Sequence, residues 1–235
     1  MERIEAFLAY VAQYRRGFLD EIAGATQHEV DTLSSLTGHV LPEFYEQFLL
    51  HLGRRDGGLD LGAGASTAIR DVLAYYDEIV RLREQDVALP PDCTVIAVSG
   101  LDVPELSIEA GDAQQRVVST SGRRILHPVA ASLEHLLYRT AFIDFRASMQ
   151  ASRATYYVTL APEVWARARD LAEREGFRRE WFSDDWSFCG EVSQTLIAIN
   201  LVDAKYVWVR LASPDPGAVA TLGDRFQRAL GLARR

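Results

Sequence analysis

The most unusual grouping of reactive and aromatic side chains lies in the stretch Trp181-Phe-Ser-Asp-Asp-Trp-Ser-Phe188. Asp184 and Asp185 stand there among four aromatic residues, and burial would raise the pKa of either carboxyl group, as an acid/base pair requires. Adjacent residues of a strand point to opposite faces, so a cooperating pair would need a turn. Three interpretations remain open: a turn whose aromatic residues join the core, a protein-binding surface that includes Trp181 and Trp186, or a catalytic site.

A second group of candidate residues is acidic and lies in or just after a glycine-rich loop. This loop has five glycines between Gly53 and Gly64, and so much backbone freedom predicts an irregular connection without helix or strand. A mobile acidic loop would suit an arginine- or lysine-rich partner, although Arg54-Arg55 would partly neutralise it. Alternatively, the acids are solvated residues that cap and flank the next helix. The candidates are Asp56, Asp60, Asp71, Asp77 and Glu78.

The other reactive residue types give no recognisable cofactor or metal site. Lys205 is the only lysine and no glycine-rich loop precedes it, which excludes a Walker-type phosphate loop. None of the five histidines stands three or four residues from another, and Cys93 and Cys189 form no CxxC or CxxH motif. The run Gly62–Ser66 lacks the upstream strand of a dinucleotide-binding fingerprint. We therefore expect neither a cofactor nor a metal ion.

The net charge of −8 is unevenly distributed along the 235 residues. Residues 1–150 carry 13 Arg against 22 Asp and Glu, a net charge of −9, whereas residues 151–235 have a net charge of +1. The acidic part would repel nucleic acid and anionic membranes and would attract a basic protein. Acidity also simply keeps proteins soluble. The negative charge therefore indicates either a basic partner or solubility alone, and both interpretations stay open.

The sequence predicts a soluble cytoplasmic protein. The N-terminal residues carry acids among apolar side chains, which is not the layout of a signal peptide. No apolar run approaches the length of about 18 residues that a membrane span needs. Two cysteines far apart in the sequence give no disulfide framework, which suits a reducing compartment.

Periodicity in the first 150 residues predicts helices, then an antiparallel meander of short strands, then a closing helix. Thr26 and Glu29 have the spacing of a capping box, and Gly38 and Gly53 stand where helices should end. This order is typical of an α+β domain. The predicted helices are 2–19, 26–38, 42–53, one from Ser66 or Thr67 to about 80, and one from Ser132; the predicted strands are 94–98, 105–109, 116–119 and 123–126.

The stretch from Gly38 to Gly53 carries a distinctive pattern, Gly–(x)2–Leu-Pro–(x)2–Tyr–(x)2–Phe-Leu-Leu. Its apolar residues fall at helical spacing on one face. With the helix before it, this pattern resembles the SUKH superfamily over residues from about 26 to 145. The resemblance implies an intracellular α+β domain of the kind found in bacterial toxin-immunity proteins, with fungal cell-wall regulators as relatives. The motif contains no reactive group, so it indicates fold more strongly than activity.

Residues 151–235 predict a second, smaller α+β part of βαββα type, either independent or docked on the first. Tyr156, Val158 and Leu160 alternate as in a strand, and Pro162 opens a helix that ends near Gly176. Residues 195–202 and 205–211 predict a hairpin across Asp203-Ala204, a pair that tight turns do not favour. The last helix comes after Ser213-Pro-Asp-Pro.

We expect a non-enzymatic protein-binding module, of an immunity type that neutralises a toxin domain by covering its active surface. A basic toxin domain such as a nuclease would be the natural partner, with no direct contact to nucleic acid or membrane. The alternative is a regulatory or scaffold protein that binds a host protein. The third hypothesis is a hydrolase or transferase that uses residues 181–188.

Overall fold

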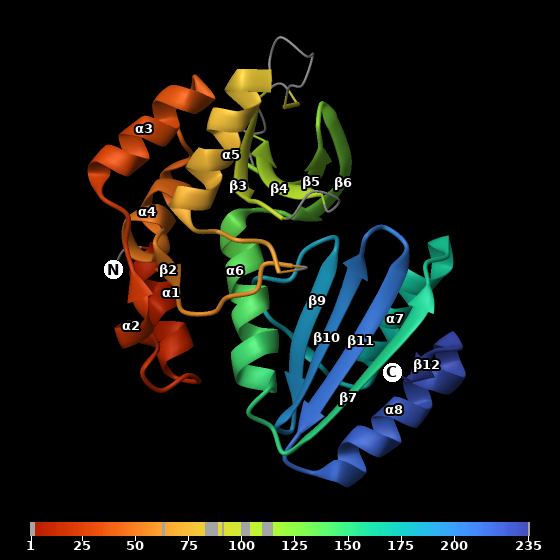
Figure 1. Cartoon of the computed structure of the whole chain (residues 1–235). Helices are drawn as coiled ribbons and strands as arrows, with labels where there is room; N and C mark the ends of the chain where they lie inside the picture. Colours follow the sequence, from red (N-terminus) through yellow and green to blue (C-terminus); the bar gives the residue numbers. More distant parts are fainter. Residues whose placement is uncertain are drawn as a thin grey trace. The chain divides into compact units, whose positions relative to one another are not determined.

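The computed structural model describes residues 3–62, 64–82, 89–90, 92–99, 104–109 and 115–234. It divides the chain into two compact units, unit 1 (Met1–Thr140) and unit 2 (Ala141–Arg235) (Figure 1). Unit 1 combines helices with an antiparallel meander, and unit 2 packs helices on an antiparallel sheet. The predicted α+β class is therefore confirmed. The division falls before the predicted boundary at residue 150.

The helical part of unit 1 begins and ends largely where capping chemistry predicts. Helix α3 (Gln27–Thr37) opens on a complete capping box, in which Thr26 and Glu29 each accept the other's backbone N–H. It closes on Gly38, whose φ of 76° lies in the left-handed region. The predicted helix over residues 2–19 is interrupted, because residues 13–17 form a turn that ends at Gly17 with φ 78°. It forms α1 (Arg3–Ala12) and the single turn α2 (Phe18–Glu21) instead.

Helix α4 (Glu43–Leu52) carries the apolar face of the motif that resembles the SUKH pattern. Tyr45, Phe48, Leu49 and Leu52 are all at most 1% exposed, and α4 contacts both α1 and α3. Three- and four-residue steps along a helix keep these positions on one side, so the four side chains enter the same core.

The glycine-rich loop contains one short strand that its composition did not predict. Strand β2 (Arg55–Asp56) pairs antiparallel with β1 (Ile22–Ala23). Gly24, directly after β1, lies against the backbone of α4, and a Cβ at that position would lie 1.8 Å from the carbonyl oxygen of Leu50. Backbone pairing to a distant segment thus orders part of a sequence that is locally irregular.

The predicted meander of unit 1 is present as a four-stranded antiparallel sheet in sequential order. Helix α5 contacts both α3 and the first strand of this sheet. Helix α6 starts after Ser132, whose Oγ accepts the backbone N–H of His135 at 3.3 Å. In chain order these elements are α5 (Ile69–Leu82), β3 (Cys93–Ala97), β4 (Glu105–Glu109), β5 (Val117–Ser121), β6 (Arg124–Ala130) and α6 (Leu133–Ala141).

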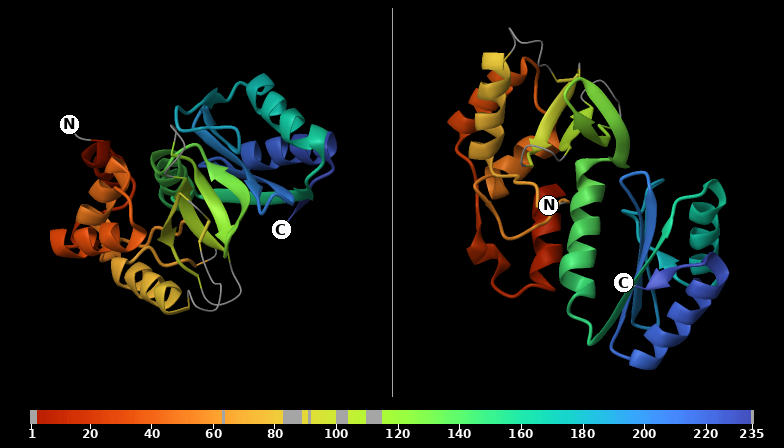
Figure 2. Two further views of the ribbon diagram at one scale, coloured as in Figure 1. Left: turned by 90° about the horizontal axis from the view of Figure 1, so that it is seen from above. Right: turned by 45° about the vertical axis from the view of Figure 1, so that its right-hand side comes forward.

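Unit 2 is built on a six-stranded antiparallel sheet of order β12-β7-β11-β10-β9-β8. Helices α7 and α8 lie on one face of this sheet, as the right-hand view of Figure 2 shows. In chain order the elements are η2 (Phe142–Ala147), β7 (Ser152–Thr159), α7 (Pro162–Arg174), β8 (Arg178–Arg179), β9 (Ser187–Val192), β10 (Thr195–Val202), β11 (Tyr206–Ser213), α8 (Pro216–Leu230) and β12 (Ala233–Arg234).

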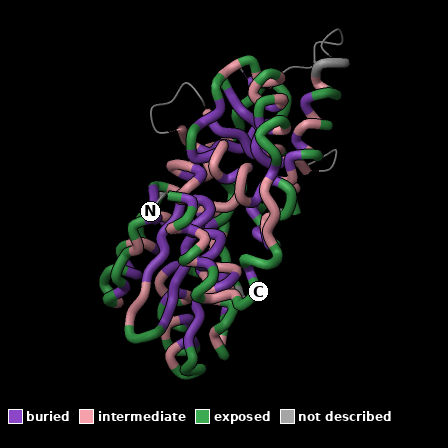
Figure 3. Tube along the Cα trace, turned by 90° about the vertical axis from the view of Figure 1, so that its left-hand side faces the viewer, coloured by how far each residue is buried: buried purple, intermediate pink, exposed green. Residues whose placement is uncertain are grey.

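The core of unit 2 lies between the sheet and its two helices. Alternate residues of β10 and β11, such as Ile197, Ile199 and Val209, are fully buried there with Phe226 of α8. Figure 3 colours the buried residues purple along these strands and shows exposed residues, in green, at their turns. We call the face of the sheet away from α7 and α8 the open face.

Two predictions for this region are corrected. The predicted βαββα order lacks three strands of unit 2, the two-residue strands β8 and β12 and the longer β9. Strand β9 begins inside the aromatic stretch at Ser187 and pairs with β10 along its length. The chain after Thr140 joins unit 2 rather than unit 1 because η2, a π-helical continuation of α6, packs on it. The Phe142 ring lies 5.8 Å from that of Phe182, and Arg146 forms an ion pair with Glu180 at 3.0 Å.

Candidate functional site

Two of the predicted partner-binding acids organise the glycine-rich loop of unit 1. Asp56 accepts hydrogen bonds from the backbone N–H of Gly58 at 2.9 Å and from the Thr67 hydroxyl at 2.6 Å. Asp60 accepts the backbone N–H of Gly62 at 2.9 Å. A short carboxylate that binds the backbone two residues ahead in this way forms an Asx turn. Both carboxylates therefore accept hydrogen bonds within the loop and stabilise its conformation, which leaves fewer of their oxygen lone pairs for a partner.

The remaining acids of this group divide between the start of α5 and its exposed surface. Asp71 accepts the Ser66 hydroxyl at 2.5 Å and the Arg70 guanidinium at 3.2 Å. Asp77 and Glu78 are exposed one to two turns further along the helix. The structure thus leaves two of the five predicted acids as plain surface charges and ties the other three into local hydrogen bonds.

The aspartates of the Trp181–Phe188 segment occupy different environments. Asp184 is 7% exposed, and its Oδ1 accepts the backbone N–H of Trp186 and the hydroxyl of Ser187, both at 2.9 Å. Asp185 is exposed. One carboxylate therefore closes a turn while its neighbour faces solvent, and the geometry does not bring the two together as an acid/base pair.

Further hydrogen bonds fix this segment to the edge of the sheet of unit 2. The Ser183 hydroxyl donates to the carbonyl of Cys189 at 3.1 Å and accepts the backbone N–H of the same residue at 2.9 Å. The backbone N–H of Glu180 also donates to the Cys189 carbonyl, at 2.8 Å. Arg146 pairs with both Glu180 and Glu191. The start of the segment, which we call its base, is therefore fixed by hydrogen bonds to β9 and by the ion pair between Glu180 and Arg146 of η2.

Trp181 projects from this fixed base. Its side chain is 56% exposed, whereas the adjacent Phe182 is 1% exposed. The indole meets the Phe182 ring edge to face, with ring centres 5.7 Å apart, and Trp186 is half-buried. The aromatic residues of the segment are thus divided between the core and one prominent surface position.

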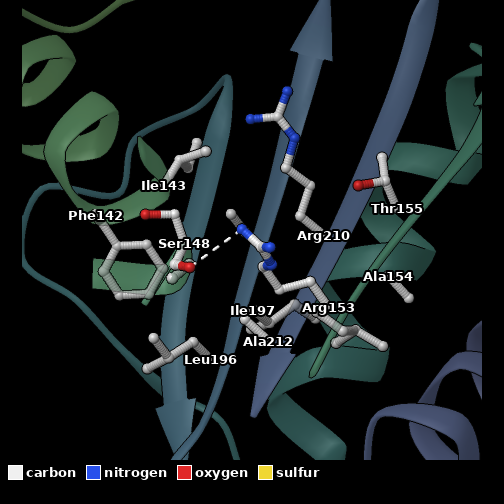
Figure 4. A pocket seen from close by; sticks show the side chains of 13 residues that line it. Phe142, Ile143, Ser148, Arg153, Ala154, Thr155, Leu196, Ile197, Arg210 and Ala212 are labelled. Atoms are coloured by element: carbon white, nitrogen blue, oxygen red, sulfur yellow. Dashed lines mark hydrogen bonds between the residues drawn. The ribbon is translucent and has the colours of Figure 1, made fainter. Parts of the chain in front are cut away.

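A pocket on the open face of unit 2 was not predicted from the sequence (Figure 4). We call it the sheet pocket, and its volume is about 120 Å³. Phe142 and Ile143 of η2 form one wall, and strands β7, β10 and β11 form the floor (Figure 4). The lining residues are Phe142, Ile143, Ala147, Ser148, Arg153, Ala154, Thr155, Leu196, Ile197, Ala198, Arg210, Leu211 and Ala212.

Two arginines reach the sheet pocket from neighbouring strands. Arg153 is exposed and donates to the carbonyl oxygen of Ser148 at 3.1 Å, the contact drawn as a dashed line in Figure 4. Arg210 is half-buried, and its guanidinium carbon lies 5.4 Å from the centre of the Trp208 ring. The sequence signal for this site was the alternation Arg153-x-Thr155 and Trp208-x-Arg210, which places each pair on one face of its strand.

The titratable groups with strongly raised pKa values lie in unit 1 and are buried or half-buried. Burial raises the pKa of the Cys93 thiol to about 11 and that of Tyr76 to about 12. The raised pKa values keep both groups protonated well above physiological pH, so neither is a candidate nucleophile. Across the described ranges, no three His, Cys, Asp or Glu side chains are grouped as metal ligands would be. No helix in the described part of the chain has the length and apolar character of a membrane span.

No protein-family model matches the chain, and none of the curated proteins is similar to it. One solved structure, the NMR structure of PA4090 from Pseudomonas aeruginosa, is similar over 35% of this chain and 94% of its own length, at 20% sequence identity. The TM-score of this comparison is 0.27, which is too low to show a shared fold. The resemblance of residues 26–145 to the SUKH superfamily stays a prediction from the sequence motif.

Proposed function

We propose that this protein is a protein-binding module of immunity type, and that Trp181 is an anchor of its interface. The observation that carries the proposal is an indole that is 56% exposed on a segment held by hydrogen bonds and ion pairs. Tryptophan is enriched among the residues that dominate binding energy, because it buries a large area with few rotatable bonds. A rigid base lowers the entropy cost of ordering it in a complex.

A basic protein is the partner that the charges favour. The first 150 residues carry a net charge of −9, and Asp77 and Glu78 are exposed on α5. Such charge accelerates the encounter with a cationic protein. The SUKH-like motif supports a toxin domain as this partner, with the acidic groups of the module standing in for an anionic substrate. A host regulatory protein is the alternative partner for the same surfaces.

The test is affinity capture of the tagged full-length protein from its native host, with co-purified proteins identified by mass spectrometry. Wild type should retain a basic partner, and Trp181→Ala should weaken that complex by about 2 kcal/mol, or roughly thirtyfold. Tyr206→Ala removes another exposed aromatic side chain of unit 2 and should change the affinity little. Equal retention by wild type and Trp181→Ala would refute the anchor role of the indole.

The contribution of charge is measured separately from that of the indole. Neutralising Asp77 and Glu78 together, as Asp77→Asn with Glu78→Gln, should slow association and flatten its dependence on salt while leaving dissociation nearly unchanged. A captured toxin domain would support the immunity function, and protection of cells from that toxin would complete the test. Capture of host regulatory proteins alone would favour the scaffold alternative.

A further inference from the structure

One wall of the sheet pocket is formed by a rare type of helix. The residues that η2 and its C-terminal neighbour contribute to the lining are Phe142, Ile143, Ala147 and Ser148. They form two pairs five positions apart, and the i→i+5 hydrogen bonds of a π-helix bring such residues to the same side. In an α-helix they would lie about 140° apart around the axis. π-Helical turns are uncommon and are found frequently at functional sites, so this wall indicates a ligand-binding role for the pocket.

The interior of the sheet pocket is apolar and has the size of one small ring. Leu196, Ala198 and Ala212 on its floor are between 2% and 4% exposed, and the two alanines fill little of the space between η2 and the sheet. The volume is about 120 Å³, and a dry cavity of about 150 Å³ accepts a benzene molecule. A drug-sized ligand needs about 300 Å³ or more. The pocket therefore admits a single ring with at most a short substituent.

The charged groups around the sheet pocket are engaged by other parts of the chain. Arg153 donates to the carbonyl oxygen of Ser148 at 3.1 Å. Arg210 lies over the Trp208 ring and has a further interaction. Helix η2 itself carries Asp144, so the elements that form the pocket bear charges of both signs. Such surroundings do not select an ion, and burying a charge against an apolar floor is costly. A neutral ligand fits this chemistry.

We propose that the sheet pocket binds a neutral compound with a single aromatic ring, held between η2 and the alanines of the floor. Phe142 on the wall contacts such a ring edge to face or in an offset stack, arrangements that stabilise beyond the burial of area. The Thr155 hydroxyl, which also lines the pocket, is a hydrogen-bond partner for a short polar substituent. None of these residues belongs to the Trp181 segment, so the site is tested independently of the proposed protein partner.

The first experiment is a titration of the full-length protein with benzyl alcohol, monitored by backbone amide NMR shifts. We expect saturable shifts at residues 142–148, 196–198 and 210–212, which line the pocket. Benzoate has a similar ring with a negative charge and should bind at least tenfold more weakly, because its carboxylate would lose water near the floor. An absence of saturable shifts with benzyl alcohol, or benzoate binding as tightly or more tightly, would overturn the proposal.

A larger compound separates a defined pocket from a merely apolar surface. 2-Naphthylmethanol has two fused rings, and its affinity for an apolar surface would rise with the larger area that it buries. In a pocket that admits one ring it should bind no more tightly than benzyl alcohol. Tighter binding of the naphthyl compound at the same residues would overturn the assignment of a single-ring site.

Two variants test the floor of the pocket. Ala212→Ile fills the floor with a branched side chain that a strand accommodates well, and it should weaken benzyl alcohol binding at least tenfold. Thr159→Ile adds the same side chain at an exposed position of β7 that does not line the pocket, and it should leave the affinity unchanged. Melting temperatures establish that each variant is folded, and the three ligands compared on wild type test the proposal without them. Unchanged binding by folded Ala212→Ile, or an equal loss in Thr159→Ile, would refute the assigned site.

Discussion

Individual aspartates in this chain have different roles according to the backbone groups within their reach. Asp56 and Asp60 each have a glycine two residues on, and each accepts the backbone N–H of that glycine. Asp184 accepts the backbone N–H of Trp186 in the same geometry. Asp77 lies within a helix, where backbone N–H groups are already used by the helix, and its carboxylate stays at the surface. Local backbone availability therefore decides which acids are free to bind a partner.

Glu29 should make stability depend on pH in acid. The backbone N–H of Thr26 donates to its carboxylate, and this is the largest of the effects that lower the pKa of that carboxyl below its usual range, with Arg54 adding to it. A carboxyl with a lowered pKa stabilises the folded state above its unfolded pKa of about 4.3, and this stabilisation is lost as pH falls through the folded pKa. At pH 7, Glu29→Gln should lower the free energy of unfolding by about 0.5 kcal/mol.

Urea unfolding of wild type and Glu29→Gln across the acid range checks this prediction. The difference between the two proteins should be largest near neutral pH and should close below the folded pKa of Glu29. Glu163→Gln is a suitable control, because Glu163 is an exposed acid in the first turn of α7 without a capping box. A gap between wild type and Glu29→Gln that stayed constant with pH would show that the carboxylate charge is not the source of the effect.

Residue-scale interactions were predictable from the sequence where both partners are close along the chain. The capping box of Thr26 and Glu29 is such a case, because its spacing alone defines its geometry. The role of Asp56 was not, since its second donor, Thr67, comes from eleven residues further on. The acids were predicted as surface charges because a sequence does not show which loop donors they will meet.

At the scale of elements, the two tight hairpins of unit 2 turn through residues in a conformation that is unfavourable for them. Between β10 and β11, Asp203 and Ala204 have φ of 52° and 49° and are followed by Lys205, whose N–H donates to the Val202 carbonyl. Between β9 and β10, Ser193 and Gln194 have φ of 46° and 67°. Two central residues with positive φ match the right-handed twist of the strands. The predicted hairpin at Asp203-Ala204 therefore forms despite an unfavourable residue pair.

Ala204→Gly should stabilise the protein by about 0.5 to 1 kcal/mol. An alanine in the left-handed region costs about 1 to 2 kcal/mol that a glycine does not, and the greater freedom of glycine in the unfolded chain offsets part of this gain. Thermal and urea unfolding measure the change. The same substitution at Ala220, an exposed residue inside α8, should destabilise by roughly 1 kcal/mol. Destabilisation by both substitutions would contradict the assigned turn.

The elements themselves were largely predictable, but their partners were not. Alternation of apolar residues predicted β7 and β11 as strands, and helical spacing predicted the buried face of α4. The pairing of β7 with β11 joins Thr155 to Arg210, which are far apart in the sequence. Arg153 and Arg210 were missed as site residues for this reason. Strand β9 was missed because it begins within a stretch whose aspartates indicated a turn, and that turn is present immediately before it.

At the scale of the whole molecule, each unit encloses its own core. The resemblance to the SUKH superfamily is predicted to extend to about residue 145, and the structure divides the chain after Thr140. The predicted boundary at residue 150 rested on the polar run before Tyr156. Composition could not show that η2 packs on strands that come later in the chain, since Phe142 and Arg146 find their partners only in the folded unit.

Two fragments of unit 2 should therefore differ in stability, although they differ only at their start. The fragment 141–235 keeps the Phe142–Phe182 contact and the pairs of Arg146 with Glu180 and Glu191, and we expect it to fold alone with cooperative urea unfolding. The fragment 151–235 loses a fully buried aromatic side chain and leaves two glutamates without their arginine. Removal of a buried Phe side chain alone costs about 3 to 5 kcal/mol, so the shorter fragment should unfold at much lower urea or not fold. Equal stability of the two fragments would show that η2 does not stabilise unit 2, and it would favour the predicted boundary near residue 150 over the division after Thr140.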